Sequence, residues 1–244
     1  MLQENEFITI DNRVVKCKKK QNKKVDDIVL LVNENKNLLK CVSYLSARKE
    51  LLPKGTFDMD KQTRKALETL IKAGKINETE AKKFEDKWMT LTHDDIGELL
   101  EAIVVFFGPY KYKFNQKRYS LESKIYEVEE NNNFDVIFYD YTKSKQPLQL
   151  KGTQKIKVSG ELEFHECKKN VSNVIPYDES KELADKDKKK FDFMKKINEI
   201  VSNSQFFIPT FSYNVDYPQK YLKNNNYGFI HIVSVKELIE YICH

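Results

Sequence analysis

Cysteine, glycine and long apolar runs are all scarce in this sequence of 244 residues. The four cysteines, Cys17, Cys41, Cys167 and Cys243, form no C-x-x-C pair, so we expect free thiols and neither a zinc site nor a disulfide framework. Only seven glycines occur, and neither G-x-x-x-x-G-K-[ST] nor G-x-G-x-x-G is present. The common phosphate-cradling loops are therefore not expected. The absence of G-x-S-x-G likewise gives no support to a Ser-His-Asp hydrolase.

The longest apolar runs, Ile28–Val32 and Ala102–Phe107, are far shorter than the roughly 18 to 20 residues that cross a bilayer. The first residues, MLQENEF, show no basic segment followed by an apolar one, so they do not resemble a secretory signal. We therefore expect a cytoplasmic protein with no membrane partner.

What is present is an ordinary globular composition with 40% hydrophobic and 32% charged residues. The length allows one large domain, or one domain with a helical extension. The net charge of +5 is mildly basic, which permits nucleic-acid binding without requiring it.

The first ninety residues are predicted to be mainly helical. Capping signals start helices at Asp26 or Asp27 and at Asn77 with Glu80, and Gly74 is expected to end one. The expected elements are a short hairpin over 7–16 and helices beginning at 28 and over 38–47, 61–73 and 77–88.

A further helix is predicted from Thr92, with Asp95 three residues on, to Phe107 before Gly108-Pro109. It is apolar nearly all round, so it should be buried. Glu98 and Glu101 lie within it, and buried carboxylates are costly unless they are paired or bound to metal.

From Ser123 onward the pattern changes to strands that alternate with helices. Strands are predicted over 125–128, 134–141, 157–168, 206–211 and 229–233, and helices over 178–201, 218–224 and 235–243. This order predicts an α/β three-layer fold with a mixed sheet.

Period-two alternation in the strand before Lys168 puts Glu166 and Lys168 on one face, while His165 and Cys167 point the other way. If this strand pairs with the one that begins at Asp135, both carboxylates meet at one end of the sheet. Two carboxylates and the carbonyl of Cys167 are hard oxygen ligands that suit Mg²⁺. The Lys168 ammonium could position or deprotonate a water, or stabilise charge on a phosphorane-like transition state.

These residues resemble the PD-(D/E)xK nuclease superfamily. Asp135 matches the motif aspartate and Glu166-Cys167-Lys168 the E-x-K, while the helix with Glu98 and Glu101 resembles the first core helix. The resemblance covers about residues 92–233 and implies an α-β-β-β-α-β, restriction-endonuclease-like core. It further implies that Glu98, with Glu101 as the reserve, assists the metal.

The sequence departs from the superfamily pattern in two ways. Phe134 replaces the proline before the aspartate, and 31 residues separate Asp135 from Glu166. Residues 142–158 must therefore form a loop or an extended hairpin.

The resemblance implies a Mg²⁺-dependent endonuclease, with Mn²⁺ expected to substitute, that prefers DNA over RNA and leaves a 5′-phosphate. It suggests a role in restriction or phage defence only by family habit. We expect residues 91–244 to form the nuclease domain and residues 1–90 a mainly helical region for dimerisation or substrate selection, with a homodimer as the assembly.

Basic and aromatic residues interleave between Tyr110 and Tyr119, a pattern that suits phosphate neutralisation and base stacking. A solvated strand edge is the equally weighted alternative. The candidate nucleic-acid contacts here and on the lysine-rich helix are Lys111, Tyr112, Lys113, Lys117, Arg118 and Lys188.

Other interpretations of the site stay open. E-x-K is often a solvated surface, Asp135 could cap a turn with Asp140 as the true ligand, and the helix carboxylates could face solvent or a subunit interface. At the level of function, the alternatives are an RNA-directed nuclease, an inactive nucleic-acid-binding module and a protein-assembly scaffold.

Overall fold

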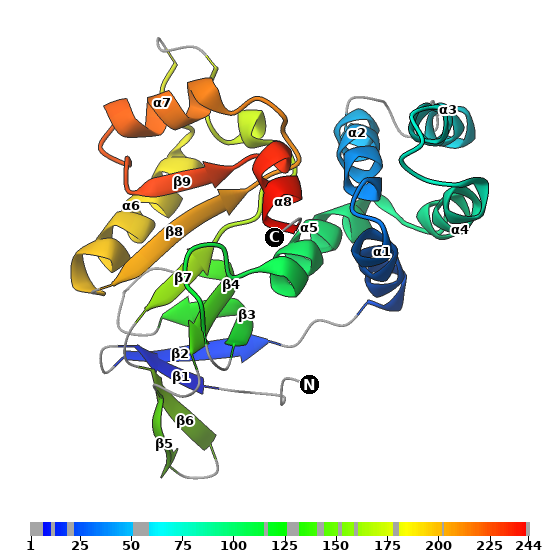
Figure 1. Cartoon of the computed structure of the whole chain (residues 1–244). Coiled ribbons are helices and arrows are strands. Elements are labelled where there is room, and N and C mark those ends of the chain that lie inside the picture. The colour runs from blue at the N-terminus through cyan, green and yellow to red at the C-terminus, as the bar shows by residue number, and fades with distance from the viewer. Residues whose placement is uncertain are drawn as a thin grey trace.

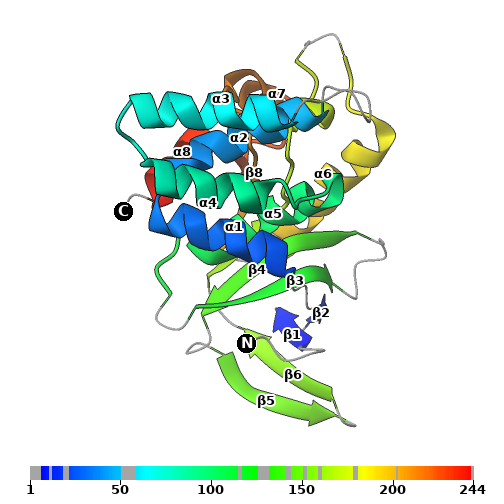
Figure 2. The ribbon, with the colours of Figure 1, turned by 90° about the vertical axis from the view of Figure 1, so that its right-hand side faces the viewer.

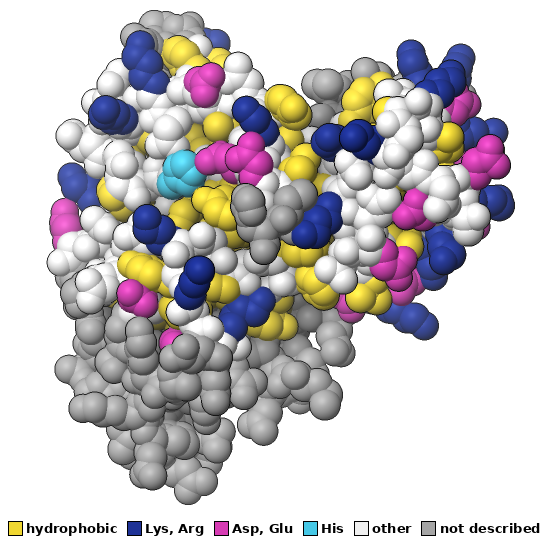
Figure 3. Space-filling model, in the orientation of Figure 1, with side chains coloured by type: hydrophobic (Ala, Val, Ile, Leu, Met, Phe, Trp, Pro, Cys, Tyr) yellow, Lys and Arg dark blue, Asp and Glu magenta, His cyan; other side chains and the backbone are white. Residues whose placement is uncertain are grey.

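The computed structural model describes residues 7–10, 13–18, 22–50, 59–114, 117–125, 132–140, 144–150, 153–158, 161–177, 181–201 and 203–242. Figure 1 shows a twisted sheet with helices packed on it, and α1 to α4 grouped beside the sheet. Figure 2 shows α1, α3 and α4 from the side as roughly parallel rods above β3 and β4. In Figure 3 a notch separates the part that carries α7 and α8 from the part that carries α2 and α3.

Nine strands form one mixed sheet, in the order β5-β6-β1-β2-β3-β4-β7-β8-β9. The pairs β6/β1, β7/β8 and β8/β9 are parallel and the other pairs are antiparallel. The strands are β1 (Phe7–Ile10), β2 (Arg13–Lys18), β3 (Lys117–Ile125), β4 (Asn133–Asp140), β5 (Ser144–Leu150), β6 (Thr153–Val158), β7 (Leu162–His165), β8 (Ser204–Pro209) and β9 (Ile230–Val233). The predicted α/β class with a mixed sheet is confirmed.

The helices are α1 (Lys23–Glu34), α2 (Leu38–Glu50), α3 (Met59–Lys72), α4 (Glu78–Trp88), α5 (His93–Phe107), α6 (Asp185–Ile200), α7 (Asp216–Asn224) and α8 (Val235–Ile242), with a short 3₁₀ turn η2 (Val171–Asn173). No helix in the described ranges has both the length and the apolar character needed to cross a membrane.

Side-chain caps explain where several helices begin. The predicted capping boxes are present at Asn77 and at Thr92. The predicted start at Asp26 or Asp27 is wrong, because Asn22 caps α1 earlier by accepting from the Lys24 N–H. Gly74, with φ of +63°, ends α3 as predicted.

Gly108 follows α5 at a point where the chain passes close to the sheet. A Cβ there would lie 2.6 Å from the Phe138 ring. Only glycine permits this approach, so the sequence at 108 fixes how closely α5 packs on β4.

Apart from the inserted β5, β6 and η2, the elements α5, β3, β4, β7, α6 and β8 come in the α-β-β-β-α-β order that the resemblance implies. β3 begins at Lys117, well before the predicted strand over 125–128, of which residues 126–128 lie outside the described residues. The predicted 157–168 region contains the end of β6 and the whole of β7. Residues 142–158 contain the extended hairpin β5/β6, which is the second of the two predicted alternatives. The predicted hairpin over 7–16 is also present, and it joins the sheet beside β3 and β6.

Strand β4 is buried on both faces, and its side chains divide between two cores. Val136 and Phe138 pack in a cluster with α1, α5 and α8, whereas Ile137 and Tyr139 pack in a second cluster with α6 and α7. The sheet is therefore the middle layer of three, as predicted.

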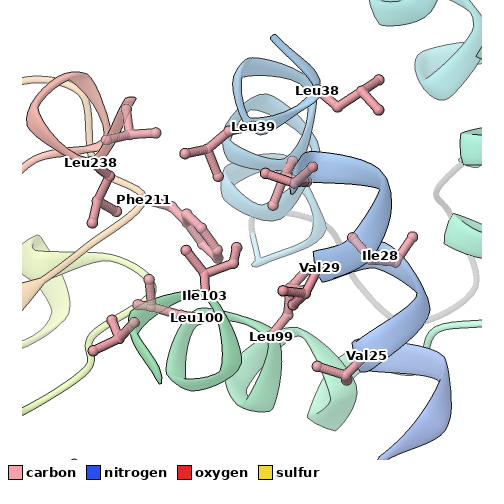
Figure 4. Packing of buried hydrophobic residues seen from close by; sticks show 14 of the residues in the cluster. Val25, Ile28, Val29, Leu38, Leu39, Leu99, Leu100, Ile103, Phe211 and Leu238 are labelled. Atoms are coloured by element: carbon pink, nitrogen blue, oxygen red, sulfur yellow. The ribbon is translucent and has the colours of Figure 1, made fainter. Parts of the chain in front are cut away.

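The N-terminal helices share the first core with α5 and are not a separate body. Figure 4 shows Val25 and Val29 of α1 close to Leu99 of α5, and Leu39 of α2 on the side of Phe211 and Leu238. Cys41, a free thiol, is buried in the same cluster. The structure thus joins the helical region to the sheet by a continuous apolar contact.

We expect Ile103→Ala to destabilise the whole chain by about 2–5 kcal/mol, because Ile103 of α5 is fully buried in the core that α5 shares with the N-terminal helices and the sheet. Denaturant unfolding should show one transition at a lower midpoint, whether followed by fluorescence or by circular dichroism. Leu30→Ala is the control, since Leu30 is 50% exposed and its loss should cost no more than about 0.5 kcal/mol. Two separated transitions, of which only one shifts, would contradict a shared core.

Candidate active site

Two carboxylates meet where β7 ends beside β4. In the antiparallel register Val136 pairs with His165, so the next residues outward, Asp135 and Glu166, reach the same end of the sheet. Asp135 Oδ2 accepts a hydrogen bond of 2.7 Å from the backbone N–H of Cys167. The pairing assumed in the sequence prediction is therefore present, and Asp135 does more than cap a turn.

Glu166 is buried between two lysines. Its Oε1 lies 2.6 Å from Lys168 Nζ, and its Oε2 lies 2.6 Å from Lys190 Nζ of α6. Lys190 also donates to the carbonyl of Asn133, next to Phe134. Glu166 and Lys168 thus lie on the α6 side of the sheet, the side that Leu162 and Phe164 share, as the alternation predicted.

Of the two helix carboxylates, the structure brings Glu101 to the Asp135 cluster. The charge of Glu101 acts on both Asp135 and Cys167. Glu98, the first choice from sequence, accepts from the Asn22 side chain at 2.9 Å. Both also line a cavity of about 290 Å³ against α1, together with Asp26.

The electrostatic state of the cluster follows from burial and from like charge. Burial, and next the neighbouring Glu166 carboxylate, raise the pKa of Asp135 from 3.8 to about 7. Burial opposes the charge on Lys168, but the carboxylates of Glu166 and Asp135 outweigh it and raise its pKa. Lys168 is therefore an ammonium at neutral pH.

The donor set suits a hard divalent cation. Asp135 and Glu166 offer carboxylate oxygens, and their mutual repulsion is the kind that a bound cation relieves. Within the described ranges no three or more His, Cys, Asp or Glu side chains are already grouped as a metal site. Mg²⁺ is commonly bound through one or two carboxylates and keeps several waters, so Asp135 and Glu166 would be enough to hold it.

Asp140, the alternative ligand, lies at the opposite end of β4. It pairs with Lys117 in the register with β3, five residues from Asp135 or about 17 Å along an extended strand. It is buried and does not belong to the cluster.

On the other face of β7, Glu163 and His165 form a buried pair. Glu163 Oε2 lies 3.1 Å from His165 Nε2 and accepts from the Tyr110 N–H at 2.8 Å. Its Oε1 accepts from the N–H groups of Lys111 and Tyr112 at 2.6 and 2.7 Å. Burial opposes ionisation of Glu163, but His165 and these N–H groups lower its pKa. His165 therefore packs away from the site, as predicted, and Glu163 anchors the chain after α5.

Two of the predicted nucleic-acid contacts have partners within the protein. Lys117 Nζ donates to the carbonyl of Gly108 at 2.7 Å and more weakly to two carbonyls in the last turn of α5. Tyr112 donates from its hydroxyl to the carbonyl of Asn203 at 3.1 Å. Lys117 thus serves the C-terminus of a helix, a position that favours a cation.

The other candidate contacts lie at the surface or outside the described side chains. Lys111 and Lys113 are exposed on the segment after α5, and Lys188 is exposed on α6. Arg118 belongs to β3, but its side chain is outside the described set.

Lys190 was not among the residues singled out from sequence. It lies four residues before Met194 and seven before Ile197, so it shares the buried stripe of α6. Helical periodicity could have distinguished it from its exposed neighbours Lys188 and Lys189.

No protein-family model matches this chain, and no curated protein matches it. Solved structures similar to it include protein VC1899 from Vibrio cholerae, at 14% identity and a TM-score of 0.40. Another is Can2 from Sulfobacillus thermosulfidooxidans in complex with cyclic tetra-adenylate, at 12% identity and a TM-score of 0.38. Each alignment covers 94% of this chain and 57% of the other, so this chain spans little more than half of either protein. At these scores neither structure bears on the chemistry of this chain.

We expect Glu163→Gln to destabilise the protein by about 2–4 kcal/mol, since a carboxamide cannot accept from all the donors that face the carboxylate. The midpoint of denaturant unfolding would measure the loss. Glu182→Gln, at an exposed position, should shift the midpoint little. Equal midpoints for the two variants would refute the anchoring role.

We expect Asp135→Asn to stabilise the folded protein, and to do so more at about pH 8 than at about pH 4.5. The pKa of Asp135 is about 7 in the folded state, against an ordinary value of 3.8. Between pH 3.8 and about pH 7 the folded state therefore binds more protons at Asp135 than the unfolded state does. Its contribution to stability therefore falls as pH rises through that window, and a neutral amide removes the loss. Thermal unfolding of both proteins across this pH range measures the difference, with exposed Asp86→Asn as control. A gain that is the same at both pH values would contradict the raised pKa.

Proposed function

We propose that this chain is a metal-dependent nuclease that hydrolyses phosphodiester bonds, with Asp135, Glu166 and Lys168 at its centre. The observation that supports the proposal most is that Asp135 and Glu166 lie together where β7 ends beside β4. The Lys168 Nζ atom lies 2.6 Å from Glu166 Oε1. An acidic pair with an adjoining ammonium, on strands that follow a buried acidic helix, suits attack on a phosphodiester better than the other chemistries open to two carboxylates.

Asp135 and Glu166 would hold Mg²⁺, with the carbonyl of Cys167 beside them and Glu101 acting through water. Bound there, the cation would supply Lewis acidity and neutralise charge on the phosphoryl oxygens. Asp135 must be ionised to bind the cation, and because its pKa is about 7, cation binding near neutral pH would release the proton that part of the Asp135 carboxyl groups carry.

Lys168 would act as a cation in this mechanism. Its raised pKa keeps the ammonium protonated, which suits it to orient the attacking water and stabilise the developing phosphorane charge. Lys168 is poorly suited to act as a general base, because the neighbouring carboxylates raise its pKa and keep it protonated. Lys190 would hold Glu166 in position from α6 and would not contact the substrate.

DNA is the proposed substrate and RNA the alternative, with a 5′-phosphate on the product. We also propose that the chain forms a homodimer and acts in restriction or phage defence.

Cleavage should be measured on supercoiled plasmid, linear single-stranded DNA and RNA, each with Mg²⁺, with Mn²⁺ and with EDTA. We expect cutting with either metal and none with EDTA. Asp135→Asn and Lys168→Ala should each slow cutting by about a hundredfold or more, because each removes charge from the reacting centre. Lys195→Ala, on the exposed side of α6, is the control. Cutting that survives both site substitutions would refute this assignment.

Glu101→Gln and Glu98→Gln form a matched pair within the same assay. The first should slow cutting by about tenfold to a hundredfold, the usual effect of losing a partner that supports a metal site. The second should have the smaller effect, because Glu98 faces Asn22.

A further inference from the structure

A groove of about 550 Å³ lies between α2 and α8. One wall comes from α2, with Lys40 and Tyr44, and the other from the segments after β7 and β8. In Figure 1, α2 and α8 face each other, and the notch in Figure 3 lies between the parts that carry them. This volume is within the range of small-molecule sites and would accept one or two nucleotides.

The lining of this groove combines basic, aromatic and polar residues with the apolar side chains of Phe211, Val235 and Ile239. Lys40 and Lys169 supply positive charge, and Tyr44 and Tyr213 supply rings. Tyr213 is 69% exposed, the highest value among the large hydrophobic side chains that the structure describes. None of the described residues that line the groove is acidic. This combination favours an anionic ligand with flat rings.

The floor of the groove is fixed by hydrogen bonds. Asn170 Oδ1 accepts from the Ser172 N–H at 3.1 Å and from the Ser212 hydroxyl at 3.3 Å. Ser43 of α2 donates from its hydroxyl to the carbonyl of Phe211 at 2.9 Å, which ties the two walls together. A ligand would therefore meet a preformed surface.

The groove begins one residue after Lys168. The Lys168 N–H donates to the carbonyl of Pro209, and the Lys169 carbonyl accepts from the Phe211 N–H. Lys168 points toward Glu166, whereas Lys169 lines the groove. Lys168 therefore lies on the α6 side of the sheet, and Lys169, the next residue, on the side of α2 and α8.

We propose that this groove binds a single-stranded segment of nucleic acid, with a base stacked on Tyr213 and phosphates near Lys40 and Lys169. The proposal rests on the proposed nuclease function. Stacking on Tyr213 requires an unpaired base, since both faces of a paired base inside a duplex are covered. It assigns α2 to substrate selection, which is one of the two roles expected for the N-terminal helices.

The test is fluorescence anisotropy in EDTA with labelled oligothymidylate, oligouridylate and a duplex, and a gel to show that the oligomers stay intact. Tyr213→Ala should weaken single-strand binding by about fivefold to a hundredfold, and Tyr213→Phe should retain it. Lys40→Ala should reduce the slope of log affinity against log salt by about 0.7. Lys223→Ala, exposed on α7 away from the groove, should leave the affinity unchanged.

Three results would overturn the proposal: no single-strand binding by the unmodified chain, unchanged binding by Tyr213→Ala, or duplex binding that is as tight and as sensitive to Tyr213→Ala. The binding assay needs no catalysis, so the two hypotheses fail separately. A chain that binds through the groove without cutting refutes the nuclease alone. A chain that cuts, with binding indifferent to the groove variants, refutes the groove alone.

Discussion

The hydrogen bond from the Cys167 N–H to Asp135 lies where the central sheet divides. As far as His165, β7 is paired with β4 on one side and β8 on the other. Beyond it the chain leaves β4 but stays bonded to β8, through Glu166 N–H to Phe207 and Lys168 N–H to Pro209. The Cys167 N–H would lose its strand partner at this split, and the Asp135 carboxylate replaces it. The split therefore places polar groups at the end of β4, a strand that is otherwise largely buried on both faces.

Two carboxylates of this region differ in charge state because their neighbours differ. Glu163 is fully buried, yet three backbone N–H groups and His165 surround it, and its pKa is lowered. Asp135 accepts from a backbone N–H but faces the carboxylates of Glu166 and Glu101, and its pKa rises to about 7. Donors stabilise one ion and like charges destabilise the other. The first is therefore suited to structure, and the second to binding a cation.

Local patterns carried the sequence predictions that are confirmed. Period-two alternation placed Glu166 and Lys168 on one face and His165 on the other, and capping residues located α4 and α5. The choice between Glu98 and Glu101 depended on how α5 rotates against α1, which no local pattern encodes. Lys117 illustrates the same limit, since it meets the carbonyls at the end of α5 only after β3 pairs with β4. The entry of β1 and β2 into the sheet likewise rests on pairing with strands more than a hundred residues away.

The shared core also determines what the N-terminal helices can do. Because α1 and α2 pack in one apolar cluster with α5 and α8, α2 cannot move relative to Lys168 without opening that core. The Ser43 bond to Phe211 fixes the same relation at the floor of the groove. A residue of α2 such as Lys40 is therefore held at a constant position from the Asp135 cluster, although more than ninety residues separate them in sequence.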